Sequence, residues 1–134
     1  MLDGTVDMIA TDHAPHSREE KAKGLKESLN GVVGLETAFS VLYTHLVRPG
    51  ILSLRGLIAL MSFRPNARFG FTPVEDYTLF DLGERETINP EHFFSMGKST
   101  PFAGMEVYGK CLLTQCGGRI AWLDDTFFYR EGQA

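Results

Sequence analysis

The chain lacks most of the features that would place it in a specialised class of protein. Its 134 residues include only two cysteines, no apolar run long enough to span a membrane and no excess of positive charge. With 13 basic and 17 acidic residues, the formal net charge of −4 gives nucleic acid or an anionic membrane nothing to bind. The first residues lack the basic and apolar regions of a signal peptide. We therefore expect a cytoplasmic globular protein without nucleic-acid or membrane partners.

The two cysteines, Cys111 and Cys116, are five positions apart. If one strand carries both, this odd spacing points their side chains to opposite faces of the sheet. A disulfide or a shared metal is then disfavoured. We expect two reduced cysteines that serve packing, as is usual in the cytoplasm.

Apolar periodicity predicts one strand and two helices in the first half of the chain. Residues 7–11 are typical of a buried strand, and the polar residues 17–30 predict a loop with a short helical turn. Residues 35–47 carry an apolar stripe at helical spacing. Ser53 can cap a second helix, which we expect to end at Arg64-Pro65, before a short helical turn at residues 66–69.

Beyond residue 70 the pattern is that of strands. Residues 77–81 alternate between apolar and polar side chains. Residues 107–116 and 119–123 flank Gly117-Gly118, a strong signal for a two-residue hairpin. The second half is therefore predicted to be a small antiparallel sheet.

The residues with most chemical potential lie at 9–16, where an apolar run ends in Asp12 and His13 and His16 follow. A carboxylate at the end of a buried strand is where α/β enzymes place catalytic groups. It can bind a cation with one oxygen and accept a proton with the other. Histidine can bind a metal or donate a hydrogen bond to an anionic substrate group. On spacing alone, an Asp that caps a loop beside two surface histidines explains the pattern equally well.

Several blocks of the sequence resemble those of dihydroorotases, which belong to the cyclic amidohydrolase branch of the amidohydrolase superfamily. They occur in the family's order and cover nearly the whole chain, which is more specific than one motif. Related allantoinases and dihydropyrimidinases share the Asp but usually lack the second His of the first block, so His16 favours dihydroorotase. The blocks are Asp12-His13-Ala14-Pro15-His16 (DHAPH), Glu19-Glu20-Lys21 (EEK), Gly34-Leu35-Glu36-Thr37-Ala38 (GLETA), Lys98-Ser99-Thr100-Pro101-Phe102-Ala103-Gly104 (close to KNTPFAG) and Gly117-Gly118-Arg119-Ile120-Ala121-Trp122 (close to GGKIAW).

The resemblance implies an α/β fold that is the C-terminal fragment of a TIM (β/α)₈ barrel. Residues 1–70 would form the last barrel strand and its helices, and residues 71–134 a segment of a C-terminal β-sandwich and a tail. A whole barrel needs roughly 250 residues, more than this chain has. The link at residues 71–76 is shorter than in many relatives, which puts one strand of the β-domain in doubt.

The resemblance also assigns roles to four residues. Asp12 matches a metal ligand and general acid/base, which takes a proton from a bridging hydroxide and passes it to the departing ring nitrogen. His16 matches a residue that holds the substrate carboxylate. Asn30 and Gly31 align with a pair whose main-chain groups bond the pyrimidine ring, although Asn30 departs from the usual Phe or Pro. The implied cofactor is zinc, one or two ions in the complete enzyme, bound weakly or not at all by this part alone.

We interpret four other polar residues as structural. His13 is expected to support its own loop, His45 to lie on the surface and His92 to belong to a turn. Glu36, near the start of the predicted helix, suits the positive end of the helix dipole.

The implied activity is that of a hydrolase of cyclic amide C–N bonds, the reversible cyclisation of N-carbamoyl-L-aspartate to L-dihydroorotate in pyrimidine biosynthesis. The resemblance implies that the full-length enzyme is a homodimer that can associate with aspartate transcarbamoylase. The chain contains no HxH pair, which the family's metal site needs, so we expect it to be inactive alone. The alternatives are a non-catalytic dihydroorotase-like scaffold subunit of aspartate transcarbamoylase and a related hydantoinase or allantoinase.

Overall fold

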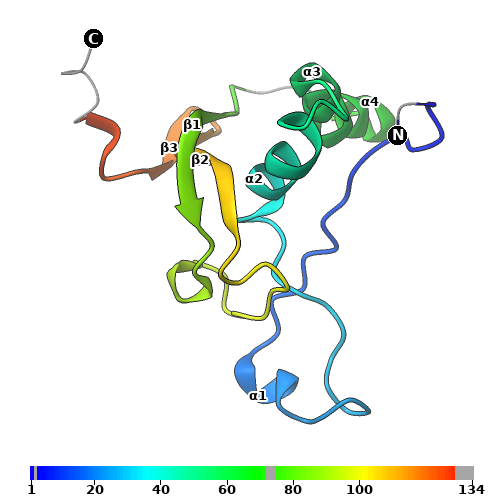
Figure 1. Ribbon diagram of the computed structural model, residues 1–134, viewed down its shortest axis with the longest axis vertical. Coiled ribbons are helices and arrows are strands. Elements are labelled where there is room, and N and C mark those ends of the chain that lie inside the picture. Colours follow the sequence, from blue (N-terminus) through cyan, green and yellow to red (C-terminus); the bar gives the residue numbers. More distant parts are fainter. Residues whose placement is uncertain (2, 72–74, 129–134) are drawn as a thin grey trace.

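The computed structural model describes residues 1, 3–71 and 75–128. An antiparallel sheet in the order β1-β2-β3 is formed by β1 (Tyr77–Thr87), β2 (Glu106–Cys116) and β3 (Arg119–Leu123) (Figure 1). The expected antiparallel segment and the hairpin at Gly117-Gly118 are therefore confirmed. Both glycines have positive φ, as a tight hairpin turn between twisted strands requires. Part of the link at residues 71–76, and the end of the tail, lie outside the described residues.

Strand β1 is longer than the five residues that alternation predicted. Its pairing with β2 shifts between Leu79 and Phe80 and again between Asp81 and Arg85. At the second shift the Asp81 carboxylate accepts hydrogen bonds from the main-chain N–H groups of Gly83 (2.8 Å) and Glu84 (3.1 Å). This irregularity interrupts the alternation, which explains why the sequence pattern ended early.

The helical part consists of two helices, and each contains a π-helical segment in which the turns are wider than in an α-helix. The first comprises α2 (Ala38–Leu42) and η1 (Tyr43–Val47), and the second comprises α3 (Leu54–Ile58), η2 (Ala59–Phe63) and α4 (Arg64–Phe69). Both predicted helices are confirmed, and Ser53 caps α3 by accepting from the Gly56 N–H (3.0 Å). The expected stop at Arg64-Pro65 is wrong, because α4 continues the same helix through Pro65, directly after the wide π-helical turn of η2.

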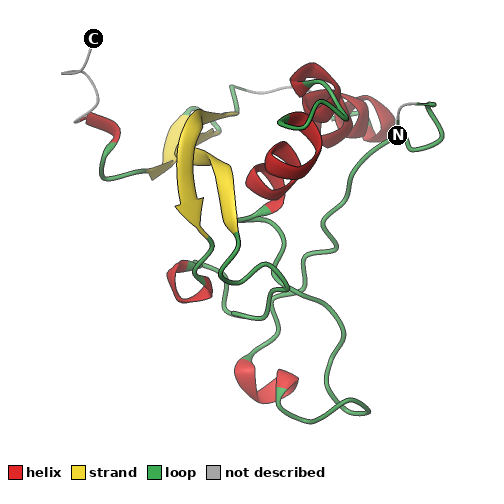
Figure 2. Cartoon of the chain, in the orientation of Figure 1, coloured by secondary structure: helices red, strands yellow, loops and turns green. Residues whose placement is uncertain are grey.

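Residues 7–11 do not form the predicted strand. The segment runs as a long loop beside the helices (Figure 2), with one main-chain bond from Ile9 N–H to the Leu60 carbonyl (3.0 Å). A strand needs a neighbour to satisfy its N–H and C=O groups, and in the described part of the chain no strand lies beside it. The barrel portion of the expected fold therefore stays a prediction.

A buried leucine cluster and a buried strand residue hold the elements together. Leu52, Leu57 and Leu60 form the core of the helices, and Val107 is fully buried on β2. The helices and the sheet meet where the rings of Phe39 and Phe80 stack, with centroids 3.8 Å apart. We call α2 to α4 with β1 to β3 the helix–sheet body.

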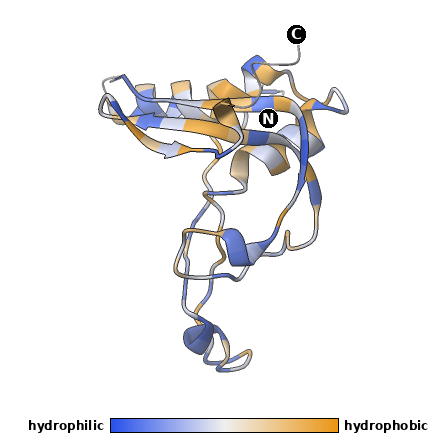
Figure 3. Cartoon of the chain, turned by 90° about the vertical axis from the view of Figure 1, so that its left-hand side faces the viewer, coloured by the Kyte–Doolittle hydropathy of each residue, from blue (hydrophilic) through white to orange (hydrophobic). Residues whose placement is uncertain are grey.

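A largely non-regular region extends away from this body (Figure 2). It contains α1 (Arg18–Lys21), a hydrophilic turn at its far end (Figure 3), and η3 (Pro90–His92) lies where β1 leads into the following loop. None of the helices in the described ranges has the length and apolar character that crossing a bilayer requires.

Candidate functional site

Asp12 has an unusual backbone. It is the one non-glycine residue among those described with a positive φ, 48°, and its side chain is exposed. The left-handed region is disfavoured for most residues, although Asp and Asn tolerate it better than others. Such conformations tend to occur at functional sites, where the surrounding structure enforces them.

The loop after Asp12 lies against the loop that carries the predicted ring-binding pair. The Ala14 N–H donates to the Val32 carbonyl (2.9 Å), and His13 pairs with Val32 in a single parallel bridge. Gly31, with φ 116°, approaches so closely that a Cβ there would lie 2.4 Å from the Ala14 Cβ. The structure thus places Gly31 against Ala14, which lies between Asp12 and His16 in the sequence, and leaves its neighbour Asn30 exposed.

His13 supports the loop, as expected. Its Nδ1 accepts hydrogen bonds from the main-chain N–H groups of Gly34 (3.1 Å) and Leu35 (3.3 Å). An accepting Nδ1 carries no proton, so this nitrogen is committed to the main chain. The ring therefore ties the Asp12 segment to the chain that leads into α2.

His16 is half-buried and faces α1. Its Nδ1 lies 3.8 Å from Glu20 Oε2, one helical turn away. Glu20 also closes a capping box with Ser17, in which its Oε2 accepts from the Ser17 N–H (2.8 Å). Hydrogen bonds from Ser17, with a smaller contribution from His16 and Lys23, hold the pKa of Glu20 below its ordinary value. The carboxylate beside His16 is thus fixed and charged.

Lys21, to which sequence reasoning assigned no role, holds the Asn30 loop. Its Nζ donates to the carbonyl oxygens of Leu29 and Gly31, each at 2.9 Å. The resemblance to the EEK block marked the position, but no local periodicity indicates that a lysine will bond two carbonyls of a later loop.

Residues 93–100 form the third segment at this place, also unassigned from sequence. A Cβ on Gly97 would lie 2.5 Å from the His16 carbonyl oxygen and 2.5 Å from the Pro15 carbonyl carbon, so only glycine fits. The Ser99 carbonyl accepts from the Val33 N–H (2.8 Å). We call residues 12–34 with residues 93–100 the loop cluster.

Glu36 is structural, but not through the helix dipole. It precedes α2, and its carboxylate accepts from the main-chain N–H groups of Phe94 (2.8 Å) and Ser95 (3.0 Å) and from the Ser95 hydroxyl. Burial raises the pKa of Glu36, but these hydrogen bonds outweigh it and lower the pKa below the ordinary value.

The other two histidines are exposed, as expected: His45 contacts the Met105 sulfur (3.2 Å) and His92 contacts Asn89 (3.2 Å).

The described residues do not fit a zinc ion on their own. Zinc sites take three or four His, Cys, Asp or Glu ligands. Within the described ranges no group of three or more such side chains lies close enough to hold a metal. Asp12 can supply one carboxylate, so the expected zinc stays a prediction for a complete enzyme.

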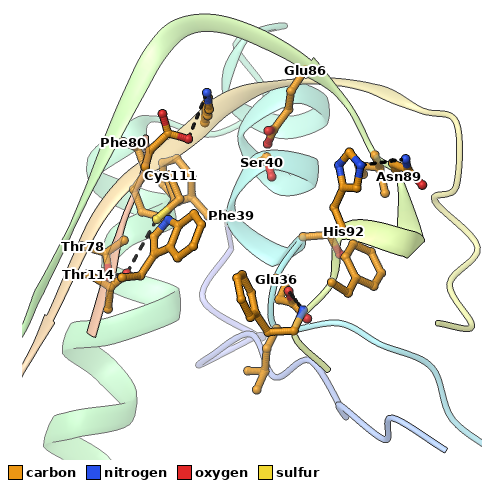
Figure 4. A pocket seen from close by; sticks show the side chains of 18 of the residues that line it. Glu36, Phe39, Ser40, Thr78, Phe80, Glu86, Asn89, His92, Cys111 and Thr114 are labelled. Carbon is orange, nitrogen blue, oxygen red and sulfur yellow. Dashed lines mark hydrogen bonds and ion pairs between the residues drawn. The ribbon is translucent and has the colours of Figure 1, made fainter. Parts of the chain in front are cut away.

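A cavity of about 550 Å³ lies elsewhere, between α2 and the sheet (Figure 4). Aromatic rings, including Phe39 and Phe80, line it beside the half-buried Glu86. Burial raises the pKa of Glu86, Lys110 lowers it by a smaller amount, and Asp124 raises it further. The lining residues include none of the four predicted site residues, although Phe93, Phe94 and Ser95 of the loop cluster border the cavity.

Sequence comparison finds curated relatives named dihydroorotase. Those of Bacillus thuringiensis (strain Al Hakam), Bacillus cereus (strain AH187) and Bacillus anthracis (strain CDC 684 / NRRL 3495) are each 47% identical to this chain. The chain resembles dihydroorotases. The matches cover 91% of this chain and 30% of each relative, so it spans less than a third of their length. This confirms the resemblance that the motifs predicted and is consistent with a C-terminal portion. No family model matches the chain.

Similar solved structures carry the names of other ring hydrolases. An L-hydantoinase (dihydropyrimidinase) from Arthrobacter aurescens is 32% identical with a TM-score of 0.80, over 90% of this chain and 30% of that one. A D-hydantoinase from a Bacillus sp. AR9 is 26% identical with a TM-score of 0.83, over 91% of this chain and 30% of that one. Dihydroorotases and hydantoinases are both cyclic amidohydrolases, so this is the kind of hydrolase that the chain resembles.

Proposed function

We propose that this chain carries the proton-transfer and substrate-binding corner of a dihydroorotase, the enzyme that interconverts N-carbamoyl-L-aspartate and L-dihydroorotate. The observation that carries the proposal is the position of Asp12. Its carboxylate is exposed on a left-handed backbone, where the loop of Gly31 packs on Ala14. The resemblance to dihydroorotases, 47% identical over 91% of this chain, supports the proposed kind of enzyme.

Asp12 would move the proton. In the hydrolytic direction its carboxylate accepts a proton from the attacking water, whose oxygen bonds to the ring carbonyl carbon. The C–N bond then breaks, and Asp12 returns the proton to the leaving nitrogen. The carbonyl becomes a carboxyl group, which releases the second proton of the water to solvent, and the nitrogen becomes the terminal amide of the carbamoyl group. An exposed carboxylate that accepts no hydrogen bond from the described part of the chain suits this exchange.

His16 and the Asn30–Gly31 pair would hold the substrate. Because Glu20 faces the His16 Nδ1, Nε2 is the nitrogen left to donate to the substrate carboxylate. Gly31 keeps the main chain close to Ala14, and therefore beside His16. A planar ring could then bond to the main chain of Asn30 and Gly31 while its carboxylate meets His16.

The chain alone is proposed to bind zinc weakly and to show no turnover, because its described residues offer no set of three ligands. When bound in a complete enzyme, zinc would polarise the carbonyl and lower the pKa of water. The homodimer, the association with aspartate transcarbamoylase and the cytoplasmic location are likewise expectations for the complete protein.

A hybrid enzyme tests the proposal. This chain replaces the matching part of the Bacillus cereus dihydroorotase, and hydrolysis of dihydroorotate, hydantoin and allantoin is measured with zinc. We expect activity on dihydroorotate, and a loss of kcat of about a thousandfold in Asp12→Asn. Asn tolerates the left-handed backbone, so this substitution removes the charge without disturbing the fold.

The same experiment separates the alternatives. A hydantoinase is favoured by the solved structures of that name, and activity on hydantoin without dihydroorotate would establish it in place of our proposal. A correctly folded hybrid with no activity on any of the three rings would support the non-catalytic scaffold instead. The isolated 134-residue chain is assayed in parallel, and turnover by it would refute the expected inactivity.

A further inference from the structure

The single turn of α1 joins the two places where substrate is proposed to bind. It begins directly after His16, and the capping box fixes its start, because Ser17 Oγ accepts from the Glu20 N–H (3.2 Å) while Glu20 bonds back to Ser17. Glu20 is thereby held 3.8 Å from His16. The first part of α1 is thus attached to the proposed carboxylate-binding residue.

The end of α1 is attached to the proposed ring-binding loop. Lys21 Nζ spans Asn30 by bonding the carbonyls before and after it, those of Leu29 and Gly31. The Lys21 main-chain carbonyl also accepts from the Ser28 hydroxyl (2.8 Å). Lys21 is half-buried, and hydrogen bonds from a charged donor are stronger than neutral ones. A solvated surface lysine would not show this arrangement.

These bonds decide which main-chain groups a ligand can reach. Lys21 occupies the Gly31 carbonyl, and the Ala14 N–H occupies that of Val32. Within the described ranges no hydrogen bond is made by Asn30. The loop therefore presents the Asn30 main chain in a shape that the ammonium group sets.

We propose that Lys21 is a positioning residue, whose ammonium holds the Asn30–Gly31 loop at a fixed distance from His16 through α1. It touches no substrate itself. The role of this loop in substrate binding rests on the proposed function, whereas the attachment of the loop does not. Removing the ammonium should leave Asp12 and its chemistry intact while the ring-binding groups lose their place.

The first test uses the full 134-residue chain and measures amide hydrogen exchange. In Lys21→Met, the amides of Ser28 and Ala14 should exchange about tenfold faster, because the loop opens more often. Lys21→Arg, which can still donate to both carbonyls, should restore the slow rates. Lys26→Met is the matched control, since Lys26 is exposed on the same loop. Equal exchange in Lys21→Met and Lys26→Met would overturn the proposal.

The second test places the same three variants in the hybrid enzyme. We expect Lys21→Met to raise KM for dihydroorotate about tenfold, equivalent to about 1.4 kcal/mol, with kcat changed less than about twofold. Lys21→Arg should return KM towards the original value. A fall in kcat at constant KM, or no change, would overturn the positioning role.

The two tests fail in different ways. If the unsubstituted hybrid is inactive on dihydroorotate, the proposed function fails, while the exchange rates still decide whether Lys21 holds the loop. If the hybrid is active and Lys21→Met behaves as Lys26→Met, the function stands and the positioning role is refuted.

Discussion

The helix–sheet body and the loop cluster are held together by different means. In the body, strand ladders pair the main chain, and Leu57 and Val107 are completely buried. In the loop cluster, individual main-chain groups bond to side chains such as Lys21 and the neighbouring Glu36, and Gly31 and Gly97 let two backbones touch. The stability of the helix–sheet body depends on the total apolar surface that it buries, whereas the position of each segment in the loop cluster depends on a few individual hydrogen bonds and close contacts. Substitutions should therefore lower overall stability in the first and displace a loop in the second.

The largest effect should come from the core of the body. Leu57→Ala removes a fully buried side chain between the helices, and we expect the free energy of unfolding to fall by about 3 kcal/mol. Denaturant titration of the chain measures this. The neighbouring Ile58 is exposed, so Ile58→Ala should cost less than about 1 kcal/mol. Similar losses for both would show that the helical core is not packed as described.

The loop cluster should be highly sensitive at Gly97. In Gly97→Ala the new methyl group meets the main chain of Pro15 and His16, which cannot rotate away, and we expect a loss of about 2 kcal/mol. The Val33 amide, bonded to Ser99, should exchange faster as the segments separate. Gly83→Ala is the control, because its added Cβ meets only Asp81 Oδ1 at 3.5 Å. If Gly97→Ala leaves the exchange rate of the Val33 amide unchanged, the loop cluster does not depend on this close contact, and the proposed difference between the two regions is wrong.

The smallest effect concerns pH in the body. The pKa of Glu86 is raised in the folded state, so the folded chain binds its proton more tightly than the unfolded chain does. Stability from this group is therefore present below pH 4.5 and is lost as pH rises through the folded pKa. Glu86→Gln cannot ionise, so it should not lose this stability as the pH rises. We expect the free energy of unfolding at pH 7 to increase by no more than about 0.5 kcal/mol, because the group is half exposed. Thermal unfolding at pH 4 and pH 7 measures it; a gain that is larger at pH 4 would contradict the assignment.

Local patterns predicted much of the body. The Gly117-Gly118 hairpin and the cap at Ser53 each depend on residues within one turn, so the sequence contains the information. The strand at residues 7–11 could not be decided in this way, because a strand exists only where another strand pairs with it. Pro65 was misleading, since a proline usually stops a helix, whereas here the helix continues through it directly after η2.

The loop cluster was predictable only as a resemblance. The DHAPH block indicated that Asp12 and His16 belong together, but nothing in it predicts the backbone angle at Asp12. The approach of Gly97 to His16 joins residues far apart in the sequence, and the bonds from Lys21 follow no period. Contacts of this kind depend on the whole fold, which composition and periodicity do not specify.

At Asp12, the residue that would be best for stability differs from the residue that the proposed chemistry needs. Glycine adopts this conformation freely, whereas an L-residue with a side chain is disfavoured there. A laboratory selection for heat resistance alone would therefore favour glycine at position 12, and the variant that it recovered would lack the carboxylate. An engineer seeking a sturdier version of this chain should hold Asp12 constant and look for gains in the helix–sheet body.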